Sequence, residues 1–182
     1  MKIYYVTKNK YKLAHAIEYT KRFGVDIEQY QTDIPEIQAP TVYEVVTHKA
    51  LRAWDDLKRP LIVSDSGWEI PSLGGFPGPY MHEINNWFSP EDFLALMRDK
   101  KERTIILNHY IAVVLGGKVK IFTEQSRGRF INQPRGEGSA LDQVVVMGES
   151  HKTIAENTNA GNVSADGQAI WKEVVEYILN NN

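Results

Sequence analysis

Cysteine is absent from all 182 residues of the sequence. Its absence excludes disulfide bonds, thiolate catalysis and zinc sites built on cysteine. Long hydrophobic runs are also missing, because no stretch approaches the roughly 20 apolar residues of a membrane-spanning helix. The first residues show neither the apolar run nor the small-residue cleavage site of a secretion signal. We therefore expect a cytoplasmic protein with no membrane partner.

A strong imbalance of charge is missing as well, since 21 Lys and Arg residues stand against 23 Asp and Glu residues, for a formal net charge of −2. Binding to nucleic acid normally needs a basic surface, so we expect no nucleic-acid partner. A local basic cleft for a small phosphate ligand remains compatible with this balance. With 42% hydrophobic residues, the composition is that of a globular protein of one domain or two closely joined lobes.

Short β-rich runs alternate with segments of helical periodicity in the first third of the chain. The runs predict strands at Met1–Val6, within Val25–Gln31 and at Leu61–Val63. The periodic segments predict a helix from Asn9 that ends before Gly24, and a helix over Thr41–Leu57 with Thr41 as its N-cap. This alternation favours an α/β fold with helices packed on the faces of a sheet.

The rest of the chain is richer in long strands and turns. Leu73–Tyr80 holds several Gly and Pro residues and predicts a shaped loop. Further predictions are a helix that opens at Ser89 and runs to about Met97, strands at Thr104–Leu115 and Lys118–Phe130 joined by a Gly116-Gly117 hairpin turn, a strand at Leu141–Met147, and a closing helix at Asp166–Leu179.

A cluster of polar residues, Thr7-Lys8-Asn9-Lys10-Tyr11-Lys12, lies where the first predicted strand meets the first predicted helix. Exposed amides at a helix N-terminus and the helix dipole favour an anion there, and Lys12 can reach back to a phosphate. The same residues also fit a simpler interpretation, namely a Thr or Asn helix cap followed by solvated lysines. The pattern alone leaves both interpretations open.

Two carboxylates are candidates for a magnesium site. Asp65 follows the apolar strand Leu61–Val63 within Ser64-Asp65-Ser66-Gly67, and ligands of α/β sheets gather at the carboxyl ends of strands. The alternative for Asp65 is a turn residue that satisfies its own backbone. Glu44 lies on the second predicted helix, where a surface glutamate is the simpler interpretation. Magnesium bound to a triphosphate usually takes only one or two carboxylates, a need that Glu44 and Asp65 together would meet.

Taken together, these segments resemble the inosine triphosphate pyrophosphatase family, which cleaves ITP, dITP and XTP to the monophosphate and pyrophosphate. The matches follow the family's order along residues 3–178. They are T-x-N-x-x-K at Thr7, Asn9 and Lys12, the approach Pro35-Glu36-Ile37-Gln38, Glu44 five residues before Lys49-Ala50, D/E-D-[ST]-G at Ser64–Gly67, and A-L-G-G-x-P-G-x-Y at Ser72–Tyr80.

The resemblance implies a fold with an elongated mixed central sheet, helices on its faces and two lobes around a nucleotide cleft, often in a homodimer. We expect one domain over 1–182, with lobe one at about 1–80 plus the C-terminal helix 164–180, and lobe two at about 81–150. In the family, residues matching Lys12 contact the phosphates, while those matching Glu44 and Asp65 hold magnesium or activate water. Catalysis is thus expected from Asp65 and Lys12, and substrate binding from Thr7, Asn9, Lys12, Lys49, Ser66, Gly67, Asp142 and Ser164.

The half of the family's site that reads the base is less well preserved. Family members carry F-G-[YW]-D-P, whose aromatic ring stacks on the purine, where this chain has Gly138–Gln143 without the Phe; Asp142 remains. The family's Lys and its S-H-R before the last helix are reduced to Ser164. Met81-His82-Glu83 replaces the frequent S-A-R, and Ser64 replaces the first acid of the D/E-D pair.

Two functions follow from the resemblance. The first is a magnesium-dependent nucleoside triphosphate pyrophosphatase that hydrolyses non-standard purine nucleotides such as dITP, ITP or XTP. The alternative is a dITP- or ITP-binding sensor subunit with little turnover that signals to a partner effector protein, a role known for proteins of this fold beside an NAD hydrolase in bacterial antiphage defence. The loss of base-reading residues gives the alternative more weight. A third hypothesis, a structural subunit without a ligand, is disfavoured by the preserved phosphate and metal motifs.

Overall fold

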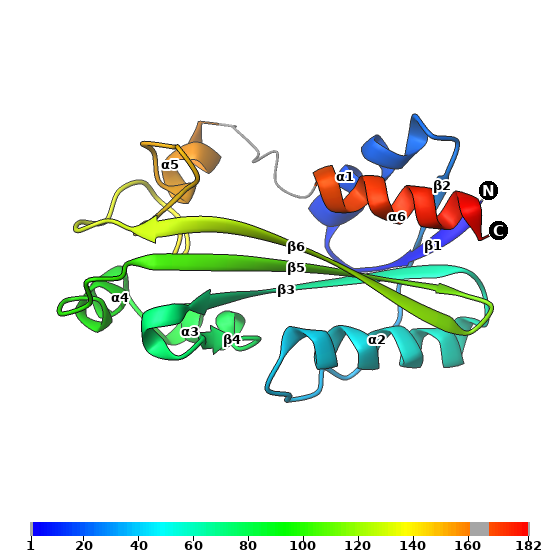
Figure 1. Cartoon of the computed structure of the whole chain (residues 1–182), viewed down its shortest axis with the longest axis horizontal. Coiled ribbons are helices and arrows are strands. Elements are labelled where there is room, and N and C mark those ends of the chain that lie inside the picture. The colour runs from blue at the N-terminus through cyan, green and yellow to red at the C-terminus, as the bar shows by residue number, and fades with distance from the viewer. Residues whose placement is uncertain (1, 161–167, 182) are drawn as a thin grey trace. The chain divides into compact units, whose positions relative to one another are not determined.

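The computed structural model describes residues 2–160 and 168–181 and has a mixed α/β fold (Figure 1), as the sequence predicts. In chain order the elements are β1 (Lys2–Val6), α1 (Lys10–Lys21), β2 (Asp26–Tyr30), α2 (Val42–Leu57), β3 (Leu61–Ile70), the 3-10 turn η1 (Pro71–Leu73), β4 (Phe76–Gly78), α3 (Met81–Trp87), α4 (Pro90–Leu96), β5 (Thr104–Leu115), β6 (Lys118–Phe130), β7 (Val145–Met147), α5 (Ile154–Asn159) and α6 (Gln168–Asn180). Among the described residues, no helix is long and apolar enough to cross a membrane.

The strands form one mixed sheet in the order β2-β1-β3-β5-β6-β7, with β4 paired to β3. β1 runs parallel to both of its neighbours. Lys2 of β1 lies opposite Asp26 on β2, and Tyr5 of β1 lies opposite Ile62 on β3. β4 pairs with β3 in the antiparallel sense, as β7 does with β6. The parallel part of the sheet therefore brings the carboxyl ends of β1 and β2 to the same edge.

The chain divides into two compact units. Unit 1 comprises the described residues of Met1–Ser66, His109–Glu124 and Gly167–Asn182, and unit 2 those of Gly67–Asn108 and Gln125–Asp166. These bounds differ from the lobes expected from the resemblance, since residues 67–80 belong to unit 2 and residues 109–124 to unit 1. Sequence order could not show this, because β5 and β6 each contribute to both units.

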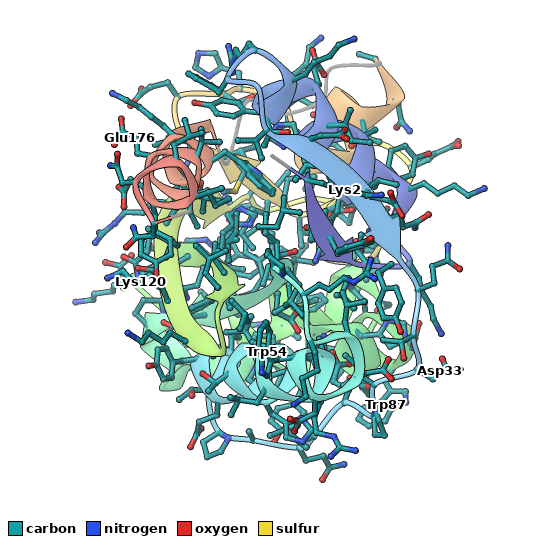
Figure 2. The ribbon with its side chains drawn as sticks, turned by 90° about the vertical axis from the view of Figure 1, so that its right-hand side faces the viewer. Lys2, Asp33, Trp54, Trp87, Lys120 and Glu176 are labelled. Atoms are coloured by element: carbon teal, nitrogen blue, oxygen red, sulfur yellow. The ribbon has the colours of Figure 1, made fainter. Side chains whose placement is uncertain are left out.

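The two faces of the sheet in unit 1 are covered by different helices. α1 and α6 cover one face and α2 covers the other (Figure 1). Trp54 of α2 lies against the β5–β6 hairpin (Figure 2). A side chain in place of Gly117, in the turn of this hairpin, would put its Cβ atom 3.4 Å from the Trp54 ring. Buried side chains of the α1/α6 face include Ile3, Tyr5, Ala16, Ile62, Ile111, Trp171 and Val174, and those of the α2 face include Val46, Ala50, Ala53, Leu61, Val63 and Ala112.

The alternation of side chains along β3 decides which face each polar residue joins. Ile62 belongs to the core under α1 and α6, whereas Leu61 and Val63 belong to the core under α2. Successive strand residues point to opposite faces of the sheet. Ser64 therefore points to the same face as Ile62, and Asp65 points to the same face as Val63. Asp65 is thereby directed toward α2, and Ser64 toward the opposite face.

Unit 2 has a core of its own, rich in aromatic rings. Phe93 lies 5.2 Å from Phe88 and 6.4 Å from Phe130, measured between ring centroids. Ser89 caps α4 in a capping box with Asp92, which confirms the helix start predicted at Ser89. Other buried members of this core are Ile70, Met81, Ile84, Met97, Ile105, Leu141, Val144 and Val145.

Several elements differ from the sequence prediction. The predicted loop over Leu73–Tyr80 contains strand β4, and α3 and α5 were not predicted. The predicted strand Leu141–Met147 is wrong in its first half, because residues 141–144 form a turn and only Val145–Met147 pairs with β6. A short apolar run cannot distinguish a buried turn from a strand. The start of the last helix, predicted at Asp166, lies outside the described residues.

Candidate functional site

A cavity of about 290 Å³ opens in unit 1 at the carboxyl ends of β1 and β2, beside the middle of β3. This is the edge of a parallel sheet where α/β proteins bind ligands. Its lining comes from four parts of the chain and consists of Val6, Thr7, Lys8, Asn9, Lys12, Tyr30, Thr32, Asp33, Ile34, Glu36, Lys49, Val63 and Ser64. The cavity thus gathers Thr7, Asn9, Lys12 and Lys49 from the residues expected to bind substrate.

The junction of β1 and α1 is built by side-chain caps. Asn9 is the N-cap of α1, and its Oδ1 accepts hydrogen bonds from the backbone N–H of Tyr11 at 2.9 Å and of Lys12 at 3.1 Å. Thr7 Oγ1 accepts from the backbone N–H of Asn9 at 3.1 Å. The expected exposed amides at this helix N-terminus are therefore already engaged at three positions. An anion here would rely on the Lys12 ammonium and the side chains of Thr7 and Asn9 instead.

Lys12 lines the cavity from the first turn of α1. Its ammonium makes no hydrogen bond or ion pair with the described residues. Burial lowers the pKa of Lys12, with a further contribution from Lys49, while the nearby Asp65 and Glu36 carboxylates oppose the change. A partly buried ammonium without a directly bound carboxylate is a ready partner for an anionic ligand.

Lys49 of α2 makes more ion pairs with described residues than any other lysine of the cavity lining. Its Nζ donates to Asp65 Oδ2 at 2.5 Å and also to Glu36 Oε1. Burial lowers the pKa of Lys49, but the Asp65 and Glu36 carboxylates outweigh that effect, so the pKa is raised overall. Lys49 therefore stays protonated, and it holds together two carboxylates that belong to different segments.

Of the two interpretations left open for Asp65, the turn residue is wrong. Asp65 lies inside β3, which continues to Ile70 because its later residues pair with β4. Asp65 nevertheless lies at the carboxyl edge of the parallel region, since β1 already ends at Val6. Its Oδ1 accepts the backbone N–H of Ser66 at 2.9 Å, and its Oδ2 is bound by Lys49.

Ser64, which replaces an acid of the family motif, pairs with a buried tyrosine. The hydroxyls of Ser64 and Tyr5 lie 2.5 Å apart, and Tyr5 is only 1% exposed. Burial raises the pKa of Tyr5 to about 12, partly offset by this hydrogen bond. A carboxylate at position 64 would point into the face that holds Tyr5 and Trp171, whereas a neutral hydroxyl is satisfied there without a counter-ion.

The outer rim of the cavity is formed by the segment after β2. Lys8 makes an ion pair with Asp33, whose side chain is 93% exposed and lies at the surface (Figure 2). The Lys8 ammonium lowers the pKa of Asp33. Because both partners are exposed, this pair contributes little to stability and can open at little cost when a ligand enters.

Glu44 has a local role that the prediction overlooked, although Thr41 followed three residues later by Glu44 is the sequence signature of a capping box. Its Oε2 accepts hydrogen bonds from the backbone N–H of Thr41 at 3.2 Å and from Thr41 Oγ1 at 2.8 Å. Thr41 Oγ1 in turn accepts the backbone N–H of Glu44 at 3.2 Å, which completes a capping box at the start of α2. This confirms Thr41 as the N-cap, and it leaves the metal-binding role of Glu44 a prediction.

The remaining candidates for substrate binding are not among the lining residues of the cavity. Ser66 is the last residue of the first segment of unit 1, Gly67 and Asp142 belong to unit 2, and Ser164 lies outside the described residues. Burial raises the pKa of Asp142, and a hydrogen bond with Ser139 opposes this rise. Their roles in binding substrate stay predictions.

Glu36 is the residue that sequence reasoning missed. The match at Pro35-Glu36-Ile37-Gln38 located the segment but gave Glu36 no role. The segment has no helical or strand periodicity, so nothing in the sequence showed that it returns to the cavity beside Asp65. The only available signal was a carboxylate in a matched motif.

Carboxylate oxygens are the protein ligands that magnesium prefers, and magnesium on a nucleotide needs only one or two of them. Glu36 and Asp65 converge on one ammonium, so the donor set at this edge of the cavity fits that requirement. Residues 2–160 and 168–181 include no group of three His, Cys, Asp or Glu side chains that could hold a metal without a nucleotide.

Comparison with solved structures defines the class of fold. The structure of a HAM1 protein from Coxiella burnetii matches with a TM-score of 0.78 at 20% sequence identity, and the match covers 99% of both chains. The Staphylococcus aureus Ham1 protein matches with a TM-score of 0.77 at 20% identity over the full length of both chains. The mixed α/β fold is therefore that of the Ham1 proteins.

The sequence leads to the same family by a separate route. The profile of the Ham1 family matches residues 3–172, and the chain belongs to this family. A dITP/XTP pyrophosphatase of Methanopyrus kandleri is 33% identical over 161 residues, which cover 86% of this chain and 84% of the relative. A dITP/XTP pyrophosphatase of Thermococcus kodakarensis is 29% identical over 186 residues, which cover 100% of this chain and 99% of the relative.

Proposed function

We propose that the chain is a magnesium-dependent nucleoside triphosphate pyrophosphatase that converts non-standard purine nucleotides such as dITP, ITP or XTP to the monophosphate and pyrophosphate. The observation that carries the proposal is the cavity of unit 1. It joins an ammonium without a directly bound carboxylate, Lys12, to Lys49 and Glu36, and Lys49 also binds Asp65 next to the cavity. Family membership and the names of the relatives support the same substrate class.

The balance of charge in the cavity supports a metal-bound nucleotide. Lys8, Lys12 and Lys49 of the lining bring three positive charges, and Asp33 and Glu36 of the lining bring two negative charges. A third negative charge comes from Asp65, which is not a lining residue but is bound to Lys49. A triphosphate carries several negative charges, which these balanced side chains do not neutralise by themselves. Magnesium would supply the missing positive charge and polarise the phosphoryl oxygens.

Within this proposal the chain's own residues position the reacting groups. Lys12 binds phosphate oxygens, with Thr7 and Asn9 adding hydroxyl and amide donors. Asp65 orients or deprotonates the attacking water, or holds the metal. Lys49 stabilises the charge that develops on the phosphates, and positioning together with charge neutralisation accounts for most catalysis of this reaction type. Gly67, Asp142 and Ser164 remain candidates for contacts with the rest of the nucleotide.

Two glutamates compete for the role of second metal ligand. Glu44 was expected from the sequence, but its carboxylate is engaged in the cap of α2. Glu36 shares Lys49 with Asp65 and lines the cavity. We therefore favour Glu36 with Asp65 as the carboxylates that would hold magnesium.

The proposal is tested with the full chain, magnesium and a panel of purine and pyrimidine nucleoside triphosphates. Pyrophosphate release and equilibrium binding are both measured for the wild type and for Asp65→Asn. We expect release from dITP, ITP or XTP above that from the standard nucleotides, and a loss of about 10²- to 10⁴-fold in Asp65→Asn.

Each outcome of this experiment decides between functions. Tight binding of a non-standard nucleotide without pyrophosphate release would contradict the enzyme and support the nucleotide sensor. No binding and no release with any nucleotide would contradict both. Asp55→Asn serves as a control, because Asp55 is an exposed α2 residue paired with Lys58 and should leave both measurements unchanged.

A further inference from the structure

Lys49 differs from other paired lysines of the chain in the number and burial of its partners. Lys2, Lys8 and Lys58 each contact one carboxylate and are at least half exposed, whereas Lys49 contacts two carboxylates and its side chain is 23% exposed. One of its partners, Asp65, is 19% exposed. The other partner, Glu36, is 64% exposed, so the ammonium of Lys49 lies between two negative groups and is sheltered on the side of Asp65.

The two carboxylates approach that position from separate parts of the fold. Glu36 comes from the segment between β2 and α2, and Asp65 comes from the middle of β3. Like charges held close together repel, so an arrangement of two carboxylates needs a cation between them. In the described structure that cation is Lys49.

We propose that Lys49 is a resident counter-ion, whose ammonium neutralises Glu36 and Asp65 while the cavity is empty and weakens the binding of a free divalent cation by these two carboxylates. The inference rests on the proposed function in one respect only, namely that the same carboxylates serve a metal–nucleotide complex. Everything else in it depends on the contacts of Lys49.

The arrangement has a consequence for the order of binding. Lys49 has a flexible four-carbon stem and a compact charge, so its ammonium can turn from the carboxylates to a phosphate oxygen. A nucleotide gives Lys49 this second partner, whereas a free cation does not. Lys49 would thus make cation binding depend on the nucleotide, because leaving Glu36 and Asp65 is costly for a sheltered ammonium without another anion.

A different reading is a purely structural ion pair. In that reading Lys49 only stabilises the fold, and its removal lowers the melting temperature without any gain in affinity for cations. The two readings therefore differ in the sign of one measurable quantity, the affinity for a divalent cation in the absence of nucleotide.

The first experiment measures binding of Mn²⁺ alone, by electron paramagnetic resonance of the free ion, to the wild type and Lys49→Met. We expect Lys49→Met to bind Mn²⁺ about tenfold more tightly than the wild type, which corresponds to about 1.4 kcal/mol. The matched control is Lys2→Met, which removes an exposed lysine paired with one carboxylate and should leave Mn²⁺ binding unchanged. Equal affinity of Lys49→Met and wild type would overturn the proposal.

Two further measurements protect the test against loss of folding. The double variant Lys49→Met/Glu36→Gln should lose the gain in affinity, because one of the two carboxylates is then neutral. In the wild type, the rate of Lys49 acetylation, followed by mass spectrometry, should rise at Mn²⁺ concentrations high enough to displace the ammonium. An unchanged rate at saturating Mn²⁺ would contradict the proposal without the use of any variant.

Failure of this inference can be told apart from failure of the proposed function. None of the three measurements includes a nucleotide or depends on turnover. Absence of pyrophosphate release with a gain of Mn²⁺ affinity in Lys49→Met would overturn the proposed function alone. Release from dITP with unchanged Mn²⁺ affinity would overturn the role of Lys49 alone.

Discussion

The cavity of unit 1 and the Gly138–Gln143 segment of unit 2 are held in shape by different kinds of interaction. In the cavity, Lys49 binds two carboxylates and Lys12 remains without an ion pair among the described residues. In the segment, the described hydrogen bonds have a backbone group on at least one side. Gln143 N–H donates to the Ser139 carbonyl at 3.3 Å, and the Asp142 carbonyl accepts from Ala155 N–H at 3.0 Å. Side chains take part as well, since Ser139 Oγ accepts from Asp142 N–H and Asn85 Oδ1 accepts from Leu141 N–H.

This difference predicts that the two regions tolerate substitution differently. Hydrogen bonds made by the backbone can hold a turn with many different side chains, so Gly138–Gln143 should tolerate replacement of side chains that make no hydrogen bond. Charged groups in a partly buried cavity are costly unless each has a partner or a ligand. Polar residues that stay in such a place are best explained by a ligand that uses them.

Among the variants that compare the two regions, Lys12→Met should have the largest effect, and it tests whether the cavity is kept for a ligand. We expect kcat/KM for dITP to fall about 10²- to 10³-fold, because the variant loses a preorganised charge at the phosphates. The melting temperature should not fall, since burial lowers the pKa of Lys12 and the charged form is therefore not favoured by folding.

The control for this variant is Lys10→Met, on the same turn but exposed and outside the cavity lining. It should leave kcat/KM unchanged. Equal losses in Lys10→Met and Lys12→Met would indicate a general effect of positive charge on nucleotide attraction rather than a specific contact.

Glu36→Gln and Glu44→Gln form a matched pair with intermediate effects. We expect Glu36→Gln to raise the magnesium concentration needed for half-maximal activity about 10- to 100-fold, because a carboxylate in or beside the metal site is lost. Glu44→Gln should leave that concentration unchanged, since glutamine also completes a capping box with Thr41. The measurement is activity over a magnesium titration for both variants. A larger increase in the required magnesium concentration for Glu44→Gln than for Glu36→Gln would indicate that Glu44 is the metal ligand.

Asp142→Asn should have the smallest effect, and it addresses the segment of unit 2. Burial raises the folded-state pKa of Asp142 above its ordinary value, so ionisation costs stability as pH rises through the ordinary value toward the folded one. The variant should therefore melt at a higher temperature than the wild type at about pH 7, and the difference should disappear at about pH 3, where both side chains are neutral. Thermal unfolding at the two pH values measures this.

An exposed residue of unit 2, Asp99, provides the comparison for that experiment. Asp99→Asn should show no pH-dependent gain. The contrary outcome is that Asp142→Asn changes the melting temperature by the same small amount at both pH values. Burial of the Asp142 carboxylate would then not oppose its ionisation in solution, and the contrast between the two regions would weaken.

Local signals carried most of what could be predicted about secondary structure. Thr41 was predicted as an N-cap from residue type and position, and a Thr or Asn cap was one of two interpretations left open for Thr7–Lys12. In the structure Asn9 and Thr41 both cap their helices. The length of β3 was underestimated, because its continuation past Val63 depends on pairing with β4 rather than on an apolar run. The engagement of the α1 amides agrees with the cap interpretation of Thr7–Lys12 and not with the exposed amides of the anion-site interpretation.

The sequence by itself determined the family and the residues that carry its motifs, because order and spacing along the chain are enough to match a motif. It also determined that the charges are balanced overall and that cysteine chemistry is excluded. The cap that Glu44 closes with Thr41 is local, and the spacing of the two residues in the sequence is enough to predict it. Only the tertiary structure decided that Glu36 meets Lys49 and Asp65. The physical reason is that hydrogen-bond and ion-pair partners are set by distance in space, and the parallel sheet brings together segments that are far apart in sequence.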